Sequence, residues 1–552
     1  MTRDVVVAAL EECVHIIGAR NFLAQAERFG LRGTCLGPAI SVERFVAAVA
    51  ERDPRIVGVG YRLSADACRT HLAALHAALD DAGLLAGRTF LFGGTAETAE
   101  VAREAGWFAA SFDGCDDREQ VLAVLRELAG KAARPEDEEC AREGRLVERV
   151  AARGALPLVR HHVGLPTVSE TVDAVRELAS SGLIDVISIA PDQAAQEAFF
   201  AGVGEREAGA GGVAVRTPSD LERIYDASRR GNYPLCRCYS GTNDVLRWAE
   251  MLLETIRNAW CAVPLSWYNT MDRRGPRPLH RSIREAVDVM RWHAARGVPV
   301  EVNEPHQWSL RRASDATAVA TAYLGALVAK HAGVAHYVSQ IMLNTPAGIA
   351  PDKDLAKALA MTEIVEGLHD ASFTSFRELR PGLLSYPPDP DAARGQLAFS
   401  TMCAMHLRPE IFHVVAFTEG TQAAGAEEIL ASVRLARRVM REVDAGYPSD
   451  AALRAPHVTE HKCWLLQEAR AILDGVRALG GGEDDALHDP AVVVRAIGCG
   501  LLDAPDLVGG EGGRGEATTA IVDGACVSID PATGGRLPEA ERVRRILEAE
   551  GI

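Results

Sequence analysis

Residues Asp4–Gly18, DVVVAALEECVHIIG, place a histidine directly behind a short apolar run. The run Asp4–Leu10 predicts a buried strand, and a helical pattern follows Gly18. In a parallel sheet, the loop that holds His15 would lie at the carboxyl edge, where ligands bind. An imidazole at that edge suits metal coordination, with its second nitrogen held by an acceptor. The alternative is a partly buried loop histidine without a ligand.

The same alternation of strand and helix patterns fills the N-terminal quarter of the chain. Short apolar strands separated by amphipathic helices predict a parallel sheet that is covered on both faces. Residues 1–132 are therefore predicted to form a doubly wound, Rossmann-like α/β domain of the flavodoxin type. Its further strands are expected at Arg32–Leu36, Arg55–Tyr61, Arg88–Phe92 and Trp107–Phe112, with helices at Ser41–Arg52 and Ala65–Ala82.

A charged stretch, residues 133–150, predicts a linker, and a longer α/β alternation follows it. Eight successive strand–helix units in residues 151–480 predict a (β/α)8 TIM barrel, whose active face lies at the carboxyl ends of its strands. Residues 481–552 are predicted to be a small C-terminal extension with a β segment at Ala520–Ile529. The barrel strands are expected at Leu156–Arg160, Asp185–Ile189, Pro234–Cys238, Ala262–Trp267, Pro299–Asn303, His336–Leu343, Gly382–Tyr386 and Ile411–Phe417.

The composition limits the classes of binding partner and the cellular compartment that we expect. The 552-residue chain has a net charge of −17, which argues against nucleic acid as a partner because a nucleic-acid binder needs a basic face. No apolar run approaches the ~20 residues that cross a bilayer, so no membrane partner is expected. The N-terminus shows no signal-peptide pattern, and the 12 cysteines form no CxxC pair. A cytoplasmic protein with reduced thiols is the expectation.

The segment from His15 to Gly94 resembles the cobalamin-binding domain of B12-dependent mutases and methionine synthase. That family carries Asp-x-His-x-x-Gly after its first strand, and the matching residues here run from Cys13 to Gly18. The resemblance implies that His15 replaces the cofactor's own base as the lower ligand of cobalt. Cys13 stands where the family has the aspartate that holds this histidine. A thiol is a weaker acceptor than a carboxylate, so weaker ligation is expected.

Two further landmarks support this resemblance. Leu36-Gly37 followed by Ser41 is similar to the family's turn after the second strand. Gly93-Gly94 is similar to a glycine pair that leaves room for the nucleotide tail of the cofactor, where a backbone must lie against the tail. Ser64 is the candidate for a family Ser/Thr near the third strand. The cofactor-binding residues that the resemblance implies are Cys13, His15, Gly18, Ser64, Gly93 and Gly94, with His15 on the metal.

From residue 156 to about 545 the chain resembles the large, barrel-forming subunit of glutamate mutase (methylaspartate mutase), which is a separate chain in that enzyme. The resemblance implies a radical carbon-skeleton rearrangement and a homodimer. In the family, adenosylcobalamin yields a 5′-deoxyadenosyl radical that takes a hydrogen from the substrate before a carbon fragment migrates. The segments that carry the resemblance are Arg160–Gly164, Tyr233–Arg237, Ser266–Asn269, Asn303–Pro305 and Gly500–Pro505.

Four residues of the predicted barrel match catalytic positions of that family. Arg160 and Arg237 match two of three arginines that grip the carboxylates of glutamate, and a guanidinium fork suits a planar carboxylate. Tyr268 matches a family tyrosine. Glu304 matches a glutamate after the fifth strand and could bind an ammonium or ribose group. For each charged residue the alternative is an ordinary salt bridge in the core or at the barrel rim.

The differences from glutamate mutase bear on the substrate. The family's second arginine is missing, since Ala190-Pro191-Asp192-Gln193 follows the second barrel strand. Ala262 lies near the position of a substrate-contacting glutamate. The substrate is therefore expected to be a different carboxylate or amino acid, or a larger molecule. Other polar and aromatic side chains near predicted strand ends are His161, His162, His306, Gln307 and Trp308.

The leading interpretation is thus an adenosylcobalamin-dependent mutase with an altered substrate. A cobalamin-dependent methyltransferase is one alternative, and it would need a methyl-acceptor site, often zinc with Cys and His ligands. A non-catalytic corrinoid-binding protein is a second alternative, which the Cys13 substitution keeps open. An aldolase-like barrel with a non-functional appended domain is a third. The form of corrinoid that is bound, or its absence, separates the four.

Overall fold

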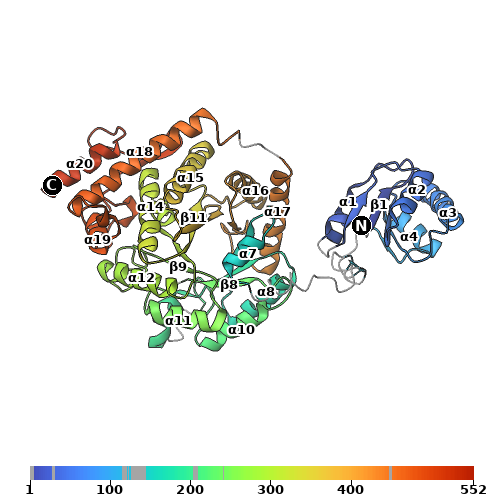
Figure 1. Ribbon diagram of the computed structural model, residues 1–552, viewed down its shortest axis with the longest axis horizontal. Coiled ribbons are helices and arrows are strands. Elements are labelled where there is room, and N and C mark those ends of the chain that lie inside the picture. The colour runs from blue at the N-terminus through green and yellow to red at the C-terminus, as the bar shows by residue number, and fades with distance from the viewer. Residues whose placement is uncertain are drawn as a thin grey trace. The chain divides into compact units, whose positions relative to one another are not determined.

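The structure is a computed structural model that describes residues 5–27, 31–114, 144–202, 209–239, 241–446 and 451–552, together with positions 121, 124, 125 and 128. The chain divides into two compact units, Met1–Glu138 and Glu139–Ile552 (Figure 1). The boundary between them falls inside the predicted linker, residues 133–150. That linker lies outside the described residues up to residue 143.

The first unit is built on a parallel sheet of five strands in the order β2-β1-β3-β4-β5. This is the order of a flavodoxin-like, doubly wound domain, and it confirms the prediction for the fold of the N-terminal part. The strands are β1 (Val5–Ala9), β2 (Gly33–Cys35), β3 (Ile56–Gly60), β4 (Thr89–Gly93) and β5 (Ala110–Phe112), and the described helices are α1 (Ile17–Glu27), α2 (Val42–Arg52), α3 (Ala65–Asp81) and α4 (Ala96–Ala105).

The side chains of β1 alternate between two cores. Val5 and Val7 pack in the core that includes Leu23 of α1. Ala8 packs in the core that includes Phe45 of α2, on the other face of the sheet. Because both faces are covered, this strand is apolar at every position, as is usual for a central parallel strand. The loops after its parallel strands meet at one edge of the sheet.

The second unit contains an eight-stranded parallel barrel in the order β8-β7-β6-β13-β12-β11-β10-β9, which a bridge between Tyr239 and Ala262 closes. It confirms the predicted TIM barrel. The strands are β6 (Leu158–Val163), β7 (Val186–Ile189), β8 (Leu235–Cys238), β9 (Cys261–Val263), β10 (Val300–Val302), β11 (His336–Met342), β12 (Thr374–Arg380) and β13 (Ile411–His413).

Helices surround this barrel (Figure 1). Those that follow its strands are α8 (Val168–Ser180), α9 (Gln193–Ala198), α10 (Pro218–Ser228), α11 (Val245–Ile256), α12 (Leu279–Ala294), α13 (Glu304–Leu310), α14 (Asp315–His331), α15 (Pro351–Glu366), α16 (Pro390–His406) and α17 (Ala426–Asp444). The helices of the C-terminal part are α18 (Pro456–Leu479), α19 (Pro490–Gly498) and α20 (Glu539–Ala549).

The prediction for the seventh barrel strand was wrong. The strand is β12 (Thr374–Arg380), whereas the predicted segment Gly382–Tyr386 lies in the loop after it. The sequence of β12, TSFRELR, contains three charged residues, and its Glu378 is fully buried. Gly382 belongs to a tight loop, because a Cβ atom there would lie 2.2 Å from Thr345 Oγ1. The strand was missed because its sequence is charged, although Glu378 and Arg380 are buried in the structure.

A short helix, α7 (Leu146–Ala152), covers one end of the barrel. Its Leu146 and Val150 pack in a core with Leu158, Val186 and Ile411. These three are the first residues of their strands, so α7 lies at the amino-terminal end of the barrel. The described part of the predicted linker from Leu146 onward therefore belongs to the second unit.

The C-terminal extension is packed onto the barrel. It contains an antiparallel hairpin of β14 (Thr519–Val522) and β15 (Ala525–Ser528), which agrees with the predicted β segment. The backbone N–H of Cys526 donates to Asp315 Oδ2 over 2.8 Å, at the first residue of α14. Ser528 Oγ lies 2.7 Å from Glu539 Oε1 in α20. The hairpin thus joins the start of a barrel helix to the final helix.

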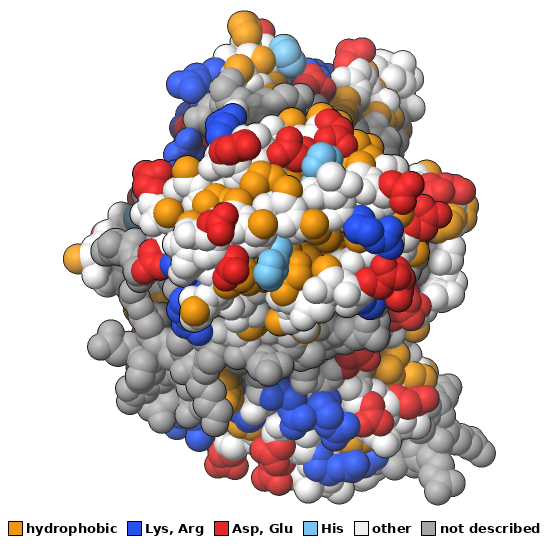
Figure 2. Space-filling model, turned by 90° about the vertical axis from the view of Figure 1, so that its right-hand side faces the viewer, with side chains coloured by type: hydrophobic (Ala, Val, Ile, Leu, Met, Phe, Trp, Pro, Cys, Tyr) orange, Lys and Arg blue, Asp and Glu red, His pale blue; other side chains and the backbone are white. Residues whose placement is uncertain are grey.

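Within the described parts of the chain, no helix combines the length and the apolar character that crossing a membrane requires. On the face drawn in Figure 2, acidic and basic side chains are interspersed.

Candidate cofactor cavity and candidate barrel site

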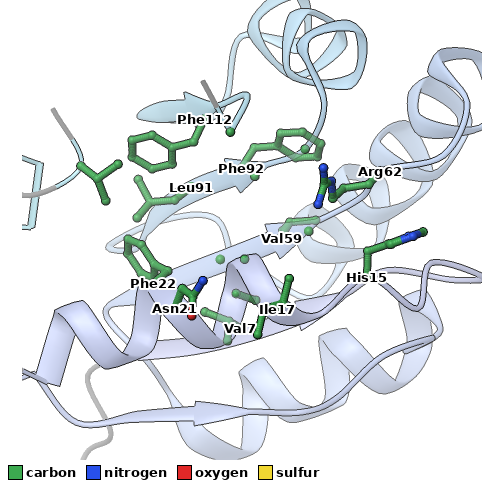
Figure 3. A pocket seen from close by; sticks show the side chains of 18 of the residues that line it. Val7, His15, Ile17, Asn21, Phe22, Val59, Arg62, Leu91, Phe92 and Phe112 are labelled. Carbon is green, nitrogen blue, oxygen red and sulfur yellow. The ribbon is translucent and has the colours of Figure 1, made fainter. Parts of the chain in front are cut away.

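A cavity of about 640 Å³ lies in the first unit between α1 and the sheet. Ile17, Asn21 and Phe22 of α1 line one side of it, and Leu91 and Phe112 of the strands line the other (Figure 3). The cavity is next to the loops at the carboxyl edge of the sheet, where doubly wound folds bind ligands. Its other lining residues are Val7, His15, Gly18, Ala19, Gln25, Gly58, Val59, Gly60, Arg62, Phe92, Gly93, Gly94, Gly114 and Val121.

The glycines that line this cavity have two different structural roles. A Cβ atom on Gly93 or on Gly18 would meet nothing within 4 Å. A Cβ atom on Gly94 would lie 2.7 Å from the carbonyl oxygen of Tyr61 and would collide with Thr98 as well. Gly94 therefore allows the protein to pack against itself, whereas Gly93 keeps the cavity open.

His15 lies at one end of the cavity and is exposed, with its ring directed away from Ile17 and Val59 (Figure 3). The Sγ atom of the buried Cys13 lies 3.8 Å from His15 Nδ1. Nε2 of His15 has no hydrogen-bond partner in the described part of the structure. Val14 and Ile17 next to it are 63% and 61% exposed. The loop therefore presents an imidazole nitrogen in an apolar surrounding.

Glu12 is not the partner of His15. Its carboxylate accepts a hydrogen bond from the Tyr61 hydroxyl and lies 3.1 Å from His71 Nε2. The hydrogen bond from Tyr61 is the main reason why the pKa of Glu12 is lowered. Glu12, although close in sequence, thus points away from the histidine.

Of the residues that the sequence implied for cofactor binding, His15, Gly18, Gly93 and Gly94 line the cavity. Cys13 and Ser64 do not. The Ser64 hydroxyl instead caps α3 by accepting from the backbone N–H of Ala67 over 3.2 Å. The polar lining residues Asn21, Gln25 and Arg62 were missed, because no sequence pattern distinguishes them from ordinary surface residues.

Arg160 and Arg237 meet inside the barrel. Both guanidinium groups donate to Ser188 Oγ, over 2.8 and 3.0 Å, and both lie within 3.4 Å of the carboxylate of Glu301. Arg160 also donates to Glu378. All of these side chains are buried. The two predicted arginines thus form part of an internal ion-pair network.

Two neutral side chains complete this network. Trp260 Nε1 donates to Glu301 Oε2 over 2.7 Å. Gln340 Nε2 donates to Glu301 Oε1 over 2.9 Å and to Glu378 Oε1 over 3.0 Å. Burial would raise the pKa of Glu301, but Arg237 and Arg160 outweigh burial and lower it. The pKa of Glu378 is raised, mainly by burial, and Glu301 adds to the effect.

The sequence reasoning missed both of these glutamates. Glu301 stands between the apolar residues Val300 and Val302 of β10. This single charge within an apolar strand was the pattern that could have indicated a polar group inside the barrel. Glu378 was missed because its strand was placed too late in the chain.

Tyr268 lies in the loop that follows β9, and Glu304 is the first residue of α13; no contact joins either of them to the arginine network in the described residues. The Arg274 guanidinium lies 3.9 Å from the centre of the Tyr268 ring. The Glu304 carboxylate accepts from Ser266 N over 2.8 Å and from Trp308 Nε1 over 3.0 Å. Burial raises the pKa of Glu304. Glu304 therefore joins the start of α13 to the loop that follows β9.

Four histidines lie near the carboxyl ends of the barrel strands, of which His161, His306 and His413 are buried and His162 is partly buried. His162 Nε2 is 3.2 Å from Arg160 Nη2 and 3.0 Å from the Tyr239 hydroxyl. Burial lowers the pKa of His161 to about 4 and the pKa values of the other three well below the usual value. These imidazoles are therefore neutral at neutral pH.

Comparison with known proteins leaves the family open. No protein-family model matches the chain, and no curated protein matches it. One solved structure that matches is that of a novel cobalamin-binding protein from Desulfitobacterium hafniense, at 25% sequence identity and a TM-score of 0.20. The match covers 23% of this chain and spans 60% of the length of that protein. The likeness covers too little of this chain to assign a family, and the cobalamin is named for that protein alone.

Proposed function

We propose that the first unit binds cobalamin and that the chain is an adenosylcobalamin-dependent carbon-skeleton mutase acting on a carboxylate or amino acid. The observation that carries the proposal is the cavity beside α1, which Gly18 and Gly93 leave open and which ends at the exposed His15. A cavity of about 640 Å³ has the size of a site for a sizeable organic group.

The donor set at this site fits a corrinoid. Among the described residues, no group of three or more His, Cys, Asp or Glu side chains could hold a metal ion. A corrinoid would need one ligand from the protein, and His15 would provide it through Nε2, which has no partner in the described structure. The lining of Leu91, Phe92 and Phe112 suits an apolar nucleotide base, and Arg62 adds a positive charge for a phosphate.

When bound, adenosylcobalamin would supply the radical chemistry that the rearrangement needs. The residues of this chain have the remaining tasks. His15 holds the corrinoid, and the barrel binds and orients the substrate and excludes water. The network of Arg160, Arg237, Glu301 and Glu378 fixes polar groups inside the barrel.

The test is the visible absorption spectrum of the full-length chain after incubation with adenosylcobalamin and desalting. We expect retained corrin with the spectrum of a histidine-ligated cobalt, and loss of that spectrum in His15→Ala. His76→Ala is the matched control, since His76 lies on α3 and does not line the cavity. A wild-type chain that retains no corrin contradicts the proposal.

Turnover is tested separately, by anaerobic incubation of the loaded chain with carboxylic and amino acids and detection of rearranged product by NMR. Retained corrin without turnover of any acid would instead favour a corrinoid-binding protein without catalysis.

A further inference from the structure

Arg380 is the last residue of β12 and thus lies at the carboxyl end of a barrel strand, the end at which TIM barrels hold their active sites. The side chain is enclosed, because Arg380 is only 7% exposed. The preceding inward charge on this strand, Glu378, belongs to the arginine network. Arg380 therefore stands one step closer to the mouth of the barrel than that network.

The guanidinium of Arg380 lacks a counter-ion. Its Nε donates to the carbonyl oxygen of Pro381 over 3.4 Å, a long contact. For neither Nη nitrogen does the described structure contain a hydrogen-bond or ion-pair partner. Arg160 and Arg237, deeper in the barrel, are both paired with glutamates. Neither Nη nitrogen is among the fully buried unpaired atoms of the described structure, so both remain open to solvent and can bind an anion that the protein itself does not supply.

The groups around Arg380 do not neutralise it. Arg160, Arg237 and Arg380 carry three positive charges, against at most two negative charges on Glu301 and Glu378. The other titratable groups that Arg380 influences are neutral: the imidazoles of His161, His162, His306 and His413, and the phenols of Tyr239 and Tyr386. The site therefore has an excess of one or more positive charges.

Unpaired polar atoms surround the same place. His161 Nε2, His306 Nδ1 and His413 Nδ1 are buried and have no hydrogen-bond partner in the described structure, and Arg380 lowers the pKa of all three imidazoles. In folded proteins nearly all such atoms are paired with protein, water or ligand. Several unpaired atoms near one unpaired cation are the pattern of a binding site for a polar molecule.

We propose that Arg380 binds the carboxylate of the substrate through its two Nη nitrogens, and that Arg160 and Arg237 support the site without contacting that carboxylate. A planar carboxylate matches the guanidinium fork. The single negative charge of a carboxylate matches the excess of positive charge better than the two charges of a phosphate. The inference rests on the proposed function and names the anchor of its substrate.

The test uses the full-length chain with and without adenosylcobalamin. The probes are propionate, glutarate, L-glutamate and inorganic phosphate, and the readout is the melting temperature of the barrel. We expect at least one carboxylate to raise the Tm of the wild-type chain. Arg380→Met should no longer respond to the carboxylate.

Affinity is measured by calorimetry on the same proteins. Loss of a charged hydrogen-bond pair predicts about 10- to 100-fold weaker carboxylate binding in Arg380→Met, with part of the affinity kept in Arg380→Lys. The control is Arg434→Gln, which removes an exposed arginine of α17. Two outcomes overturn the proposal: a carboxylate response that is unchanged in Arg380→Met, or a wild-type chain that responds to phosphate alone or to no probe.

Corrin retention separates this inference from the proposed function. If Arg380 is not the anchor, its variants still retain corrin through His15 and bind carboxylate like the wild type. If the chain does not bind cobalamin, the wild type retains no corrin. Carboxylate binding by the wild type and by the Arg380 variants can still be compared in that case.

Discussion

The Sγ atom of Cys13 lies 3.8 Å from Nδ1 of His15, so a thiol contacts the histidine at the end of the candidate cofactor cavity. A thiol is a weak hydrogen-bond acceptor and carries no charge when protonated. A carboxylate in its place would orient the ring more firmly and make Nε2 a stronger ligand.

We therefore expect Cys13→Asp to strengthen cobalt ligation by His15. Partners of metal-bound histidines change metal affinity by about 10- to 100-fold, and a gain in the lower part of that range is expected here. The measurement is the fraction of histidine-ligated corrin at limiting cofactor, read from the visible spectrum. Cys13→Ser is the control for size, and equal spectra for the serine and aspartate variants would show that this position does not act on His15.

Gly93→Val should block the cavity without unfolding the first unit. The new side chain would enter open space at the end of β4, and valine suits a strand. We expect corrin affinity to fall by about tenfold or more, equivalent to about 1.4 kcal/mol, with an unchanged Tm of the apoprotein. Gly94→Ala is the contrasting variant, because its Cβ atom would collide with Tyr61 O and should lower the Tm. Full corrin binding by Gly93→Val would place the cofactor elsewhere.

Arg160→Met should destabilise the barrel strongly. The change leaves Glu378 and Glu301 buried with one counter-ion fewer, and breaking such a buried pair costs about 3–5 kcal/mol. The free energy of unfolding in urea measures the loss. In the double variant Arg160→Met, Glu378→Gln the loss should be smaller than the sum of the two single changes, because both charges of one pair are removed. Additive losses would mean that the two residues do not interact.

The stability of the barrel should fall as the pH drops below about 6.5, in part through His293. This side chain is fully buried, and both ring nitrogens lack a partner in the described structure. Burial lowers the pKa of His293 from 6.5 to about 4. Between these values the unfolded chain binds a proton that the folded chain does not, which costs up to about 1.4 kcal/mol per pH unit.

Unfolding in urea at several pH values measures this effect. His293→Leu should unfold like the wild type, or with greater difficulty, at pH 7.5, and should lose less stability on acidification. His280→Leu is the control on the same helix, since His280 is exposed. A parallel pH dependence of His293→Leu and the wild type would contradict the assignment.

The strands could be predicted where burial makes them apolar. The whole of β1 and most of the other strands fall within the predicted segments, because central parallel strands tolerate few polar residues. β12 could not be found this way, since it carries Arg377, Glu378 and Arg380 and places Glu378 inside the barrel. The apolar pattern fails where the interior of a barrel is polar.

The residues of the candidate sites were predicted only in part, because some contacts join residues that are far apart in the sequence. His15 and Gly93 belong to local motifs and line the cavity. The partners of Arg160 are 141 and 218 residues away in sequence, so only closure of the barrel brings Glu301 and Glu378 to it. Whether an arginine meets a carboxylate of the protein or remains unpaired, like Arg380, depends on this long-range geometry.

The hairpin Thr519–Ser528 also has a consequence for genetics. Its Cys526 N–H satisfies one oxygen of Asp315, whose other oxygen lies 3.1 Å from the buried Lys357. A nonsense allele that stops before residue 519 would still encode all eight barrel strands, but it would leave a buried acceptor unpaired, at a cost of about 1–3 kcal/mol. It would also expose the start of α14, so the shortened product should be degraded in the cell rather than persist as a smaller protein.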